Sequence, residues 1–308
     1  MRSGWVRVGQ WLAGLLIIGL AARSLLRNWT ELRSQPLEWR IEPGWLVLSA
    51  LLVWAMYALL IVAWRMMLAG WGQRLDGWTA ARIWTVSSLG KYLPGKVWAI
   101  AGMALLAQRA GIAAWAATGS AVVLQVLAIG TGAAVAGLTG RQAIAAADPR
   151  LGAGLGVLIA GAVAGVALLL WPAFLRRLLQ LAAPDAEARG TPPVAGIAFG
   201  IVANLVAWLG YGLALWLLAR GLLPSAGLDP ALAIAVFTAS YLAGFLALFA
   251  PGGIGVREGL FILMLQGPLG IAAATALALA SRVLLTITEL GAAVPFLVFT
   301  QGRARVAP

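Results

Sequence analysis

The stretch Phe249-Ala250-Pro251-Gly252-Gly253-Ile254-Gly255-Val256-Arg257-Glu258-Gly259 decides how this chain folds. It lies between two apolar runs, which places it at membrane depth rather than in an aqueous loop. One proline and four glycines in eleven residues cannot continue a helix through this point. Inside a bilayer, an interrupted backbone is tolerated only where protein or a water-filled cavity satisfies its polar groups. The charged pair Arg257 and Glu258 follows the break at once, so the sequence predicts a site here.

A second break of the same kind interrupts the first half of the chain, at Gly90-Lys91-Tyr92-Leu93-Pro94-Gly95-Lys96-Val97-Trp98. Pro94 and Pro251 lie 157 residues apart (251 − 94), about half the length of the 308-residue chain. Apolar segments that are interrupted by glycine and proline at corresponding positions of two halves indicate the substrate site of a transporter.

The composition is that of a membrane protein. Hydrophobic residues make up 62% of the chain and charged residues 10%, and the mean hydropathy is +0.93. Cysteine and histidine are absent, which excludes disulfides and removes the commonest metal ligand and general base. We therefore predict no catalytic residue, no metal and no cofactor. The net charge of +12 comes mostly from arginines that flank apolar spans, which favours contact with anionic lipid over contact with nucleic acid.

The apolar runs predict six full spans and two helical hairpins within a single membrane domain, residues 1–308. In the first repeat, residues 1–150, the spans cover about 9–27, 42–65 and 109–141, and a hairpin covers 78–108 with its tip at 92–95. In the second repeat, residues 151–308, the spans cover about 151–171, 194–219 and 270–300, and a hairpin covers 230–266 with its tip at 251–255.

This order predicts an all-α, polytopic inverted repeat. Each half has three full crossings, an odd number, so the second half enters from the opposite face and the two re-entrant hairpins approach from opposite sides. Ten arginines in the predicted cytoplasmic segments against six in the outer ones favour this orientation. The ten are Arg2, Arg7, Arg65, Arg74, Arg109, Arg176, Arg177, Arg189, Arg303 and Arg305; the six are Arg27, Arg33, Arg40, Arg141, Arg150 and Arg220. If each hairpin is instead one broken crossing, there are eight spans and the halves are parallel repeats.

Both hairpin tips have the properties of an anion site. Pro94 suits the first turn of a helix, and Val256 begins a second half-helix, so two helix N-termini lie at the tips. Free N–H groups and the positive end of the helix dipole favour an anion. Lys91, Lys96 and Arg257 add full positive charge. The alternative is that the lysines extend to lipid headgroups at the interface.

Two further charges lie inside the last span. Arg282 and Glu289 are seven residues apart, on nearly one helix face. A charge at mid-bilayer costs about 2.5–3.5 kcal/mol, so such residues normally face a cavity or form a pair. We expect Glu289 to pair with Arg282 or Arg257, with Glu258 as the other acidic partner. The pattern fits a structural ion-pair network and a proton or substrate relay equally.

The predicted substrate-binding residues therefore come from the two tips and the last span. They are Lys91, Tyr92, Pro94, Gly95, Lys96, Pro251, Gly252, Gly253, Gly255, Arg257, Glu258, Arg282 and Glu289.

The two tip sequences, together with the Trp64-Arg65 ending of the second span, resemble the lysylphosphatidylglycerol synthase transmembrane family, also called flippase-like domain proteins. The resemblance covers essentially the whole chain. In one member, the bacterial multiple peptide resistance factor, a domain of this type is thought to move a cationic aminoacyl phospholipid between leaflets. That member also carries a soluble aminoacyltransferase domain, which is missing here, so the resemblance implies a lipid-handling protein without lipid aminoacylation.

The sequence thus predicts a multi-pass protein of the bacterial inner (plasma) membrane that is not an enzyme. It would act as a lipid flippase or transporter-like protein and bind an anionic (phospho)lipid headgroup between the two broken-helix hairpins. Its partners would be membrane lipids and a possible lipid-modifying transferase. One alternative is a non-transporting partner that presents lipid to a separate transferase. Another is a membrane-embedded transferase acting on lipid-linked sugars, for which Glu258 and Glu289 are almost the only candidate bases at depth.

Overall fold

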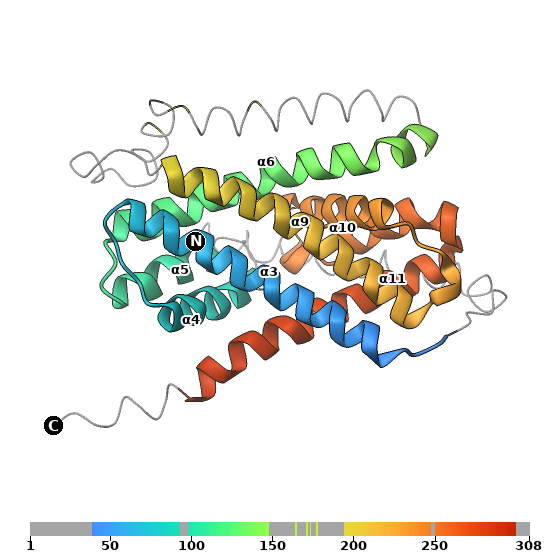
Figure 1. Ribbon diagram of the computed structural model, residues 1–308, viewed down its shortest axis with the longest axis horizontal. Helices are drawn as coiled ribbons and strands as arrows, with labels where there is room; N and C mark the ends of the chain where they lie inside the picture. The colour runs from blue at the N-terminus through green and yellow to red at the C-terminus, as the bar shows by residue number, and fades with distance from the viewer. Residues whose placement is uncertain are drawn as a thin grey trace, which may run out of the picture.

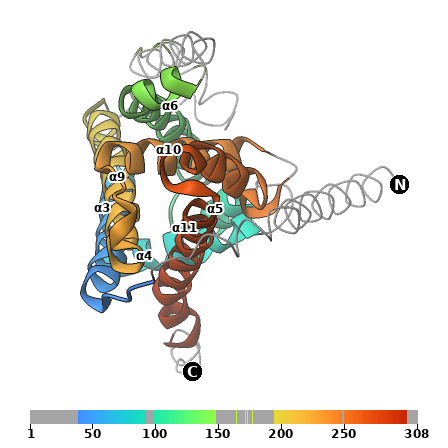
Figure 2. The ribbon, with the colours of Figure 1, turned by 90° about the vertical axis from the view of Figure 1, so that its right-hand side faces the viewer.

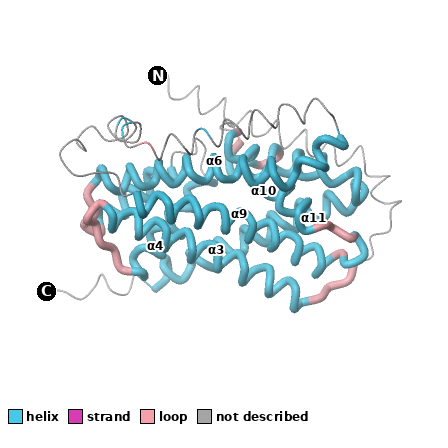
Figure 3. The backbone as a smooth tube through the Cα atoms, turned by 45° about the horizontal axis from the view of Figure 1, so that its top comes forward, coloured by secondary structure: helices cyan, strands magenta, loops and turns pink. Residues whose placement is uncertain are grey.

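The computed structural model describes residues 39–92, 98–147, 194–247 and 250–299, together with four isolated residues between 164 and 177. This part of the chain is helical and contains no strand, as predicted. Figure 1 shows the helices, and Figure 3 shows the longer loops gathered toward the two ends of the bundle. The elements are α3 (Pro43–Gly70), α4 (Gly77–Ser88), η1 (Leu89–Tyr92), α5 (Trp98–Arg109), α6 (Ala114–Ala147), α9 (Val194–Leu222), η3 (Pro224–Ala226), α10 (Pro230–Leu246), η4 (Pro251–Gly253) and α11 (Val256–Phe299).

Four helices are long and apolar enough to cross a membrane: α3, α6, α9 and α11. They correspond to four of the six predicted spans, whereas the predicted spans 9–27 and 151–171 lie outside the described residues. The helix α3 continues five residues past Arg65, where we expect the span to end. The Arg65 side chain turns toward the following loop, and its Nε donates to the Leu75 carbonyl at 3.0 Å.

The helices α3 and α9 run side by side in opposite directions on one flank of the bundle (Figures 1 and 2). At the start of α3, the amides of Arg40 and Glu42 donate to the carbonyls of Leu222 and Gly221, which end α9. Glycines of α9 allow the close approach, as small residues at helix interfaces in membranes generally do. A Cβ on Gly196 would lie 2.9 Å from the Met67 Cα, so no larger residue fits there.

Each predicted hairpin appears as two helices that pack together, α4 with α5 and α10 with the start of α11. The first arm of each begins in the same way, with an aspartate at the N-cap. The Asp76 carboxylate accepts from the Thr79 amide, and the Asp229 carboxylate accepts from the Leu232 amide, both at 2.9 Å. Of the predicted tip of the first hairpin, 92–95, Tyr92 is described, and residues 93–97 lie outside the described residues.

The long helix α11 contains a break that separates the second arm of the hairpin from the last span. Gly270 has φ 79° and ψ 158°, a conformation that is open to glycine and strained for other residues. Pro268 lies two residues earlier and removes one helical hydrogen-bond donor. The residues 256–269 and 271–299 are therefore two helical arms, close to the predicted boundary between 266 and 270.

The two helix interruptions, one at η1 and one at η4, meet inside the bundle. The elements η1 and η4 are in contact, and a Cβ on Gly252 would lie 3.3 Å from the Tyr92 ring. One apolar core is formed by residues of α3, α4, α5 and α6 together with the beginning of α9. A second is formed mainly by residues of α9, α10 and α11. The cavity described below is lined by helices of both cores.

Candidate functional site: a charged cavity between two helix breaks

A cavity of about 290 Å³ lies where η1 and η4 meet, and every long described helix contributes to its wall. Of the predicted site residues, those that line it are Lys91, Tyr92, Gly252, Gly253, Arg257, Arg282 and Glu289. Glu258 joins them by accepting a hydrogen bond from Arg282, and the Gly255 amide donates in turn to Glu258. Pro251 begins η4. Pro94, Gly95 and Lys96 lie outside the described residues.

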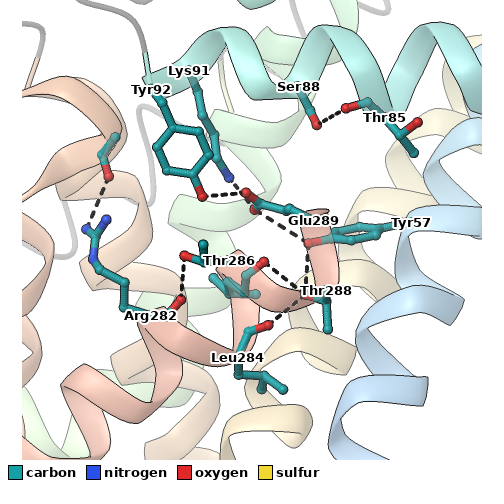
Figure 4. A network of polar contacts seen from close by, with 12 residues as sticks. Tyr57, Thr85, Ser88, Lys91, Tyr92, Arg282, Leu284, Thr286, Thr288 and Glu289 are labelled. Atoms are coloured by element: carbon teal, nitrogen blue, oxygen red, sulfur yellow. Dashed lines mark hydrogen bonds and ion pairs between the residues drawn. The ribbon is translucent and has the colours of Figure 1, made fainter. Parts of the chain in front are cut away.

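Glu289 on α11 connects the last span to the tip of the first hairpin (Figure 4). Its carboxylate forms an ion pair with the Lys91 ammonium and accepts a hydrogen bond of 2.7 Å from the Tyr92 hydroxyl. The Tyr57 hydroxyl, near the middle of α3, lies 3.5 Å from the same carboxylate. Only 6% of Glu289 is exposed, so this charge depends on these partners.

The prediction that Glu289 pairs with Arg282 or Arg257 is wrong. Arg282 and Glu289 share a helix face, but seven residues separate them by about 10.5 Å along the axis at 1.5 Å per residue. The tip of the first hairpin brings Lys91 to the carboxylate instead. Arg282 pairs with Glu258, the acidic residue beside the second break.

Arg282 forms contacts with the second break, just as Glu289 does with the first. Its Nε donates to the Glu258 carboxylate, and its Nη2 donates to the Gly252 carbonyl at 3.2 Å. The other oxygen of Glu258 accepts from the Gly255 amide at 2.8 Å, which satisfies a free donor at the start of α11. A carboxylate of the chain therefore already occupies part of the predicted anion site at this helix N-terminus.

Arg257 differs from the other two cations because none of the ion pairs among the described residues includes it. Its Nη2 donates to the Ser281 hydroxyl at 2.9 Å. The guanidinium lies 5.4 Å from the Phe237 ring and 5.6 Å from the Tyr241 ring, two rings that stack on each other. It is 7% exposed and lines the cavity. In the described cluster, three cations against two carboxylates leave one positive charge, and Arg257 carries it.

All four tyrosines of the chain line this cavity: Tyr57, Tyr92, Tyr211 and Tyr241. The sequence prediction includes only one of them. A signal was present, because Tyr57, Tyr211 and Tyr241 lie well inside apolar runs, whereas membrane tyrosines normally gather near span ends. A tyrosine at mid-span indicates a polar neighbour for its hydroxyl.

Two amide side chains also line the cavity, Gln125 from α6 and Asn204 from α9. The Asn204 Nδ2 donates to the Gly200 carbonyl of its own helix at 2.8 Å, which leaves its side-chain oxygen for other partners. The remainder of the wall is largely apolar, with residues such as Leu60, Ile100 and Leu124. The cavity therefore suits a molecule that has one charged end and one apolar end.

This geometry is that of a helical membrane protein with a charged cavity where two interrupted helices meet. The chain belongs to the lysylphosphatidylglycerol synthase transmembrane family, because the sequence model of that family, the lysylphosphatidylglycerol synthase TM region, matches residues 10–288. The match contains both breaks and confirms the resemblance that the tip sequences predict. Among curated proteins, none matches the chain.

Proposed function

We propose that this protein is a lipid flippase or transporter-like protein of the bacterial inner membrane. It binds the anionic headgroup of a (phospho)lipid between its two broken-helix hairpins and carries no enzymatic activity. The observation that supports this most is Arg257, a buried cation without a carboxylate partner among the described residues, in a cavity formed where the two breaks meet. A buried charge of this kind needs a counter-ion, and a lipid phosphate would supply one.

The inverted repeat with two re-entrant hairpins is part of this proposal. Its support is the antiparallel pairing of α3 with α9, the two helices that precede the hairpins. Helices that occupy equivalent places in an inverted repeat run in opposite directions. In the eight-span alternative both helices would cross the membrane in the same direction, which does not fit the pairing of Glu42 with Gly221.

In the proposed cycle, the two carboxylates balance the cations while the cavity is empty. Glu289 neutralises Lys91, and Glu258 neutralises Arg282. A headgroup phosphate would bind Arg257 first and then compete with these carboxylates for Lys91 or Arg282. The first ion pair ties η1 to the last span, and the second ties the start of α11 to the same span, so their exchange would release the two hairpins one at a time. The movement would be passive or driven by protons or by the membrane potential.

Reconstitution in liposomes tests the proposal. The full chain is reconstituted with fluorescent phosphatidylglycerol, and the fraction that reaches the outer leaflet is followed by reduction of the fluorophore from outside. We expect faster exchange than in empty liposomes, and a loss of about tenfold or more in Arg257→Gln, because a charge-assisted hydrogen bond is removed.

Arg220 provides the matched control. It is also an arginine over two aromatic rings, Trp45 and Trp216, but it is exposed and does not line the cavity. Arg220→Gln should keep the exchange rate of the unmodified chain. Exchange no faster than in empty liposomes, or an equal loss in both variants, would contradict the proposal. Lipid binding without exchange, together with a co-purifying transferase, would favour the lipid-presenting alternative.

A further inference from the structure

Resting on the proposed function, we infer that the cavity selects a phosphodiester lipid with one negative charge and an uncharged, hydroxyl-bearing headgroup. Three features of the described residues lead to this class of lipid. They are the net charge of the cluster, the cationic partners that its carboxylates already have, and the neutral polar groups on the cavity wall.

The net charge of the cluster matches a phosphodiester. Lys91, Arg257 and Arg282 against Glu258 and Glu289 leave one positive charge. A phosphodiester carries one negative charge and neutralises it. A phosphomonoester carries about 1.5 to 2 negative charges near neutral pH, which is more than the described cluster balances.

Among the described residues, the two carboxylates that would bind an ammonium group most strongly already have cationic partners. Glu289 and Glu258, the carboxylates of the described cluster, already accept from Lys91 and Arg282. Two of the aromatic faces that could attract a cation, those of Phe237 and Tyr241, already carry the Arg257 guanidinium, and the Tyr92 ring lies 5.3 Å from the Lys91 ammonium. A headgroup amine would therefore face the net positive charge of the described cluster and would have to compete with Lys91 or Arg282 for a carboxylate.

The wall does offer neutral hydrogen-bonding groups beside Arg257. Tyr241 stacks on Phe237, and Phe237 stacks on Tyr211 at 5.6 Å, so these two hydroxyls belong to the same aromatic wall as the guanidinium. Gln125 and Asn204 line the cavity with amide groups. Aromatic faces combined with hydroxyls and amides can donate to and accept from a polyol, such as a glycerol or sugar headgroup.

The test compares four fluorescent lipids in liposomes that contain the full chain. Phosphatidylglycerol is the expected substrate. Phosphatidylmethanol keeps the charge and lacks the hydroxyls, phosphatidic acid is a phosphomonoester, and phosphatidylethanolamine adds an ammonium group. We expect phosphatidylglycerol to exchange about tenfold faster than phosphatidic acid and phosphatidylethanolamine, and several-fold faster than phosphatidylmethanol, since one or two hydrogen bonds are lost. Exchange of phosphatidylethanolamine or phosphatidic acid at the rate of phosphatidylglycerol overturns the inference.

The double variant Tyr211→Phe/Tyr241→Phe keeps both rings and removes both hydroxyls. It should reduce the ratio of the phosphatidylglycerol rate to the phosphatidylmethanol rate toward one, and an unchanged ratio in a folded variant argues against the hydroxyl contacts. Binding separates this inference from the transport claim. If no lipid exchanges but phosphatidylglycerol raises the melting temperature in detergent more than the other three lipids do, the headgroup class stands and the transport claim fails. If no lipid exchanges and none stabilises selectively, the headgroup class fails as well.

Discussion

The ion pair between Lys91 and Glu289 is the contact that ties the first hairpin to the last span, and a double-mutant cycle measures its strength. The variants are Lys91→Met, Glu289→Gln and the two combined. The Glu289 side chain is 7% exposed and the Lys91 side chain is 29% exposed. Removal of one partner from a buried pair costs about 3–5 kcal/mol, because the other charge stays buried without compensation.

The two single variants should differ in size. Lys91→Met leaves the more deeply buried Glu289 charge, which among the described residues keeps the hydroxyls of Tyr92 and Tyr57, so we expect a loss of about 3–5 kcal/mol. Glu289→Gln leaves Lys91, which is partly exposed to the cavity, and the new amide can still accept from Tyr92. We expect a smaller loss there, about 1–3 kcal/mol.

The measurement is the free energy of unfolding of the full chain in mixed micelles, from its equilibrium denaturation curve. The double variant contains neither charge, so it should be about as stable as Glu289→Gln alone, which makes the two losses non-additive by the whole Lys91→Met loss, about 3–5 kcal/mol. If the losses add to within about 0.5 kcal/mol, the pair is not formed and this description of the site is wrong.

Two further predictions test the packing and the topology. Gly212→Ala on α9 should cost about 1–3 kcal/mol of stability, because the new Cβ would overlap the backbone of Ile234 on α10; Gly259→Ala, where nothing lies within 4 Å, should not destabilise, and equal effects would contradict the packing. In the naturally cysteine-free chain, Ala145→Cys and Ser225→Cys should both react with a membrane-impermeant thiol reagent added outside, whereas labelling of the two from opposite sides would contradict the inverted repeat.

The helices and their breaks could be predicted from the sequence because both depend on local physics. Hydropathy over about 20 residues identifies a span, and glycine with proline identifies an interruption. The start of α11 at Val256 agrees with the prediction for this reason. The kink at Gly270 also lies close to the predicted boundary, since glycine is the residue that adopts its backbone conformation without strain.

The partners of the charged side chains could not be predicted in the same way. Glu289 and Lys91 lie 198 positions apart in sequence, and helical periodicity relates only residues within one helix. The choice between Arg282, Arg257 and Lys91 depends on where the two hairpin tips meet, which is a property of the whole bundle. Tyr57, Tyr211 and Tyr241 were missed because a mid-span position indicates a polar neighbour for the hydroxyl but does not say which cavity or partner supplies it.

The most direct test of the central claim is an experimental structure of the full chain in nanodiscs that contain phosphatidylglycerol. We expect headgroup density in the cavity between η1 and η4, with a phosphate within hydrogen-bonding distance of the Arg257 guanidinium. Resolved lipids that surround the helices while this cavity stays empty, or Arg257 paired with a carboxylate of the chain, would contradict it.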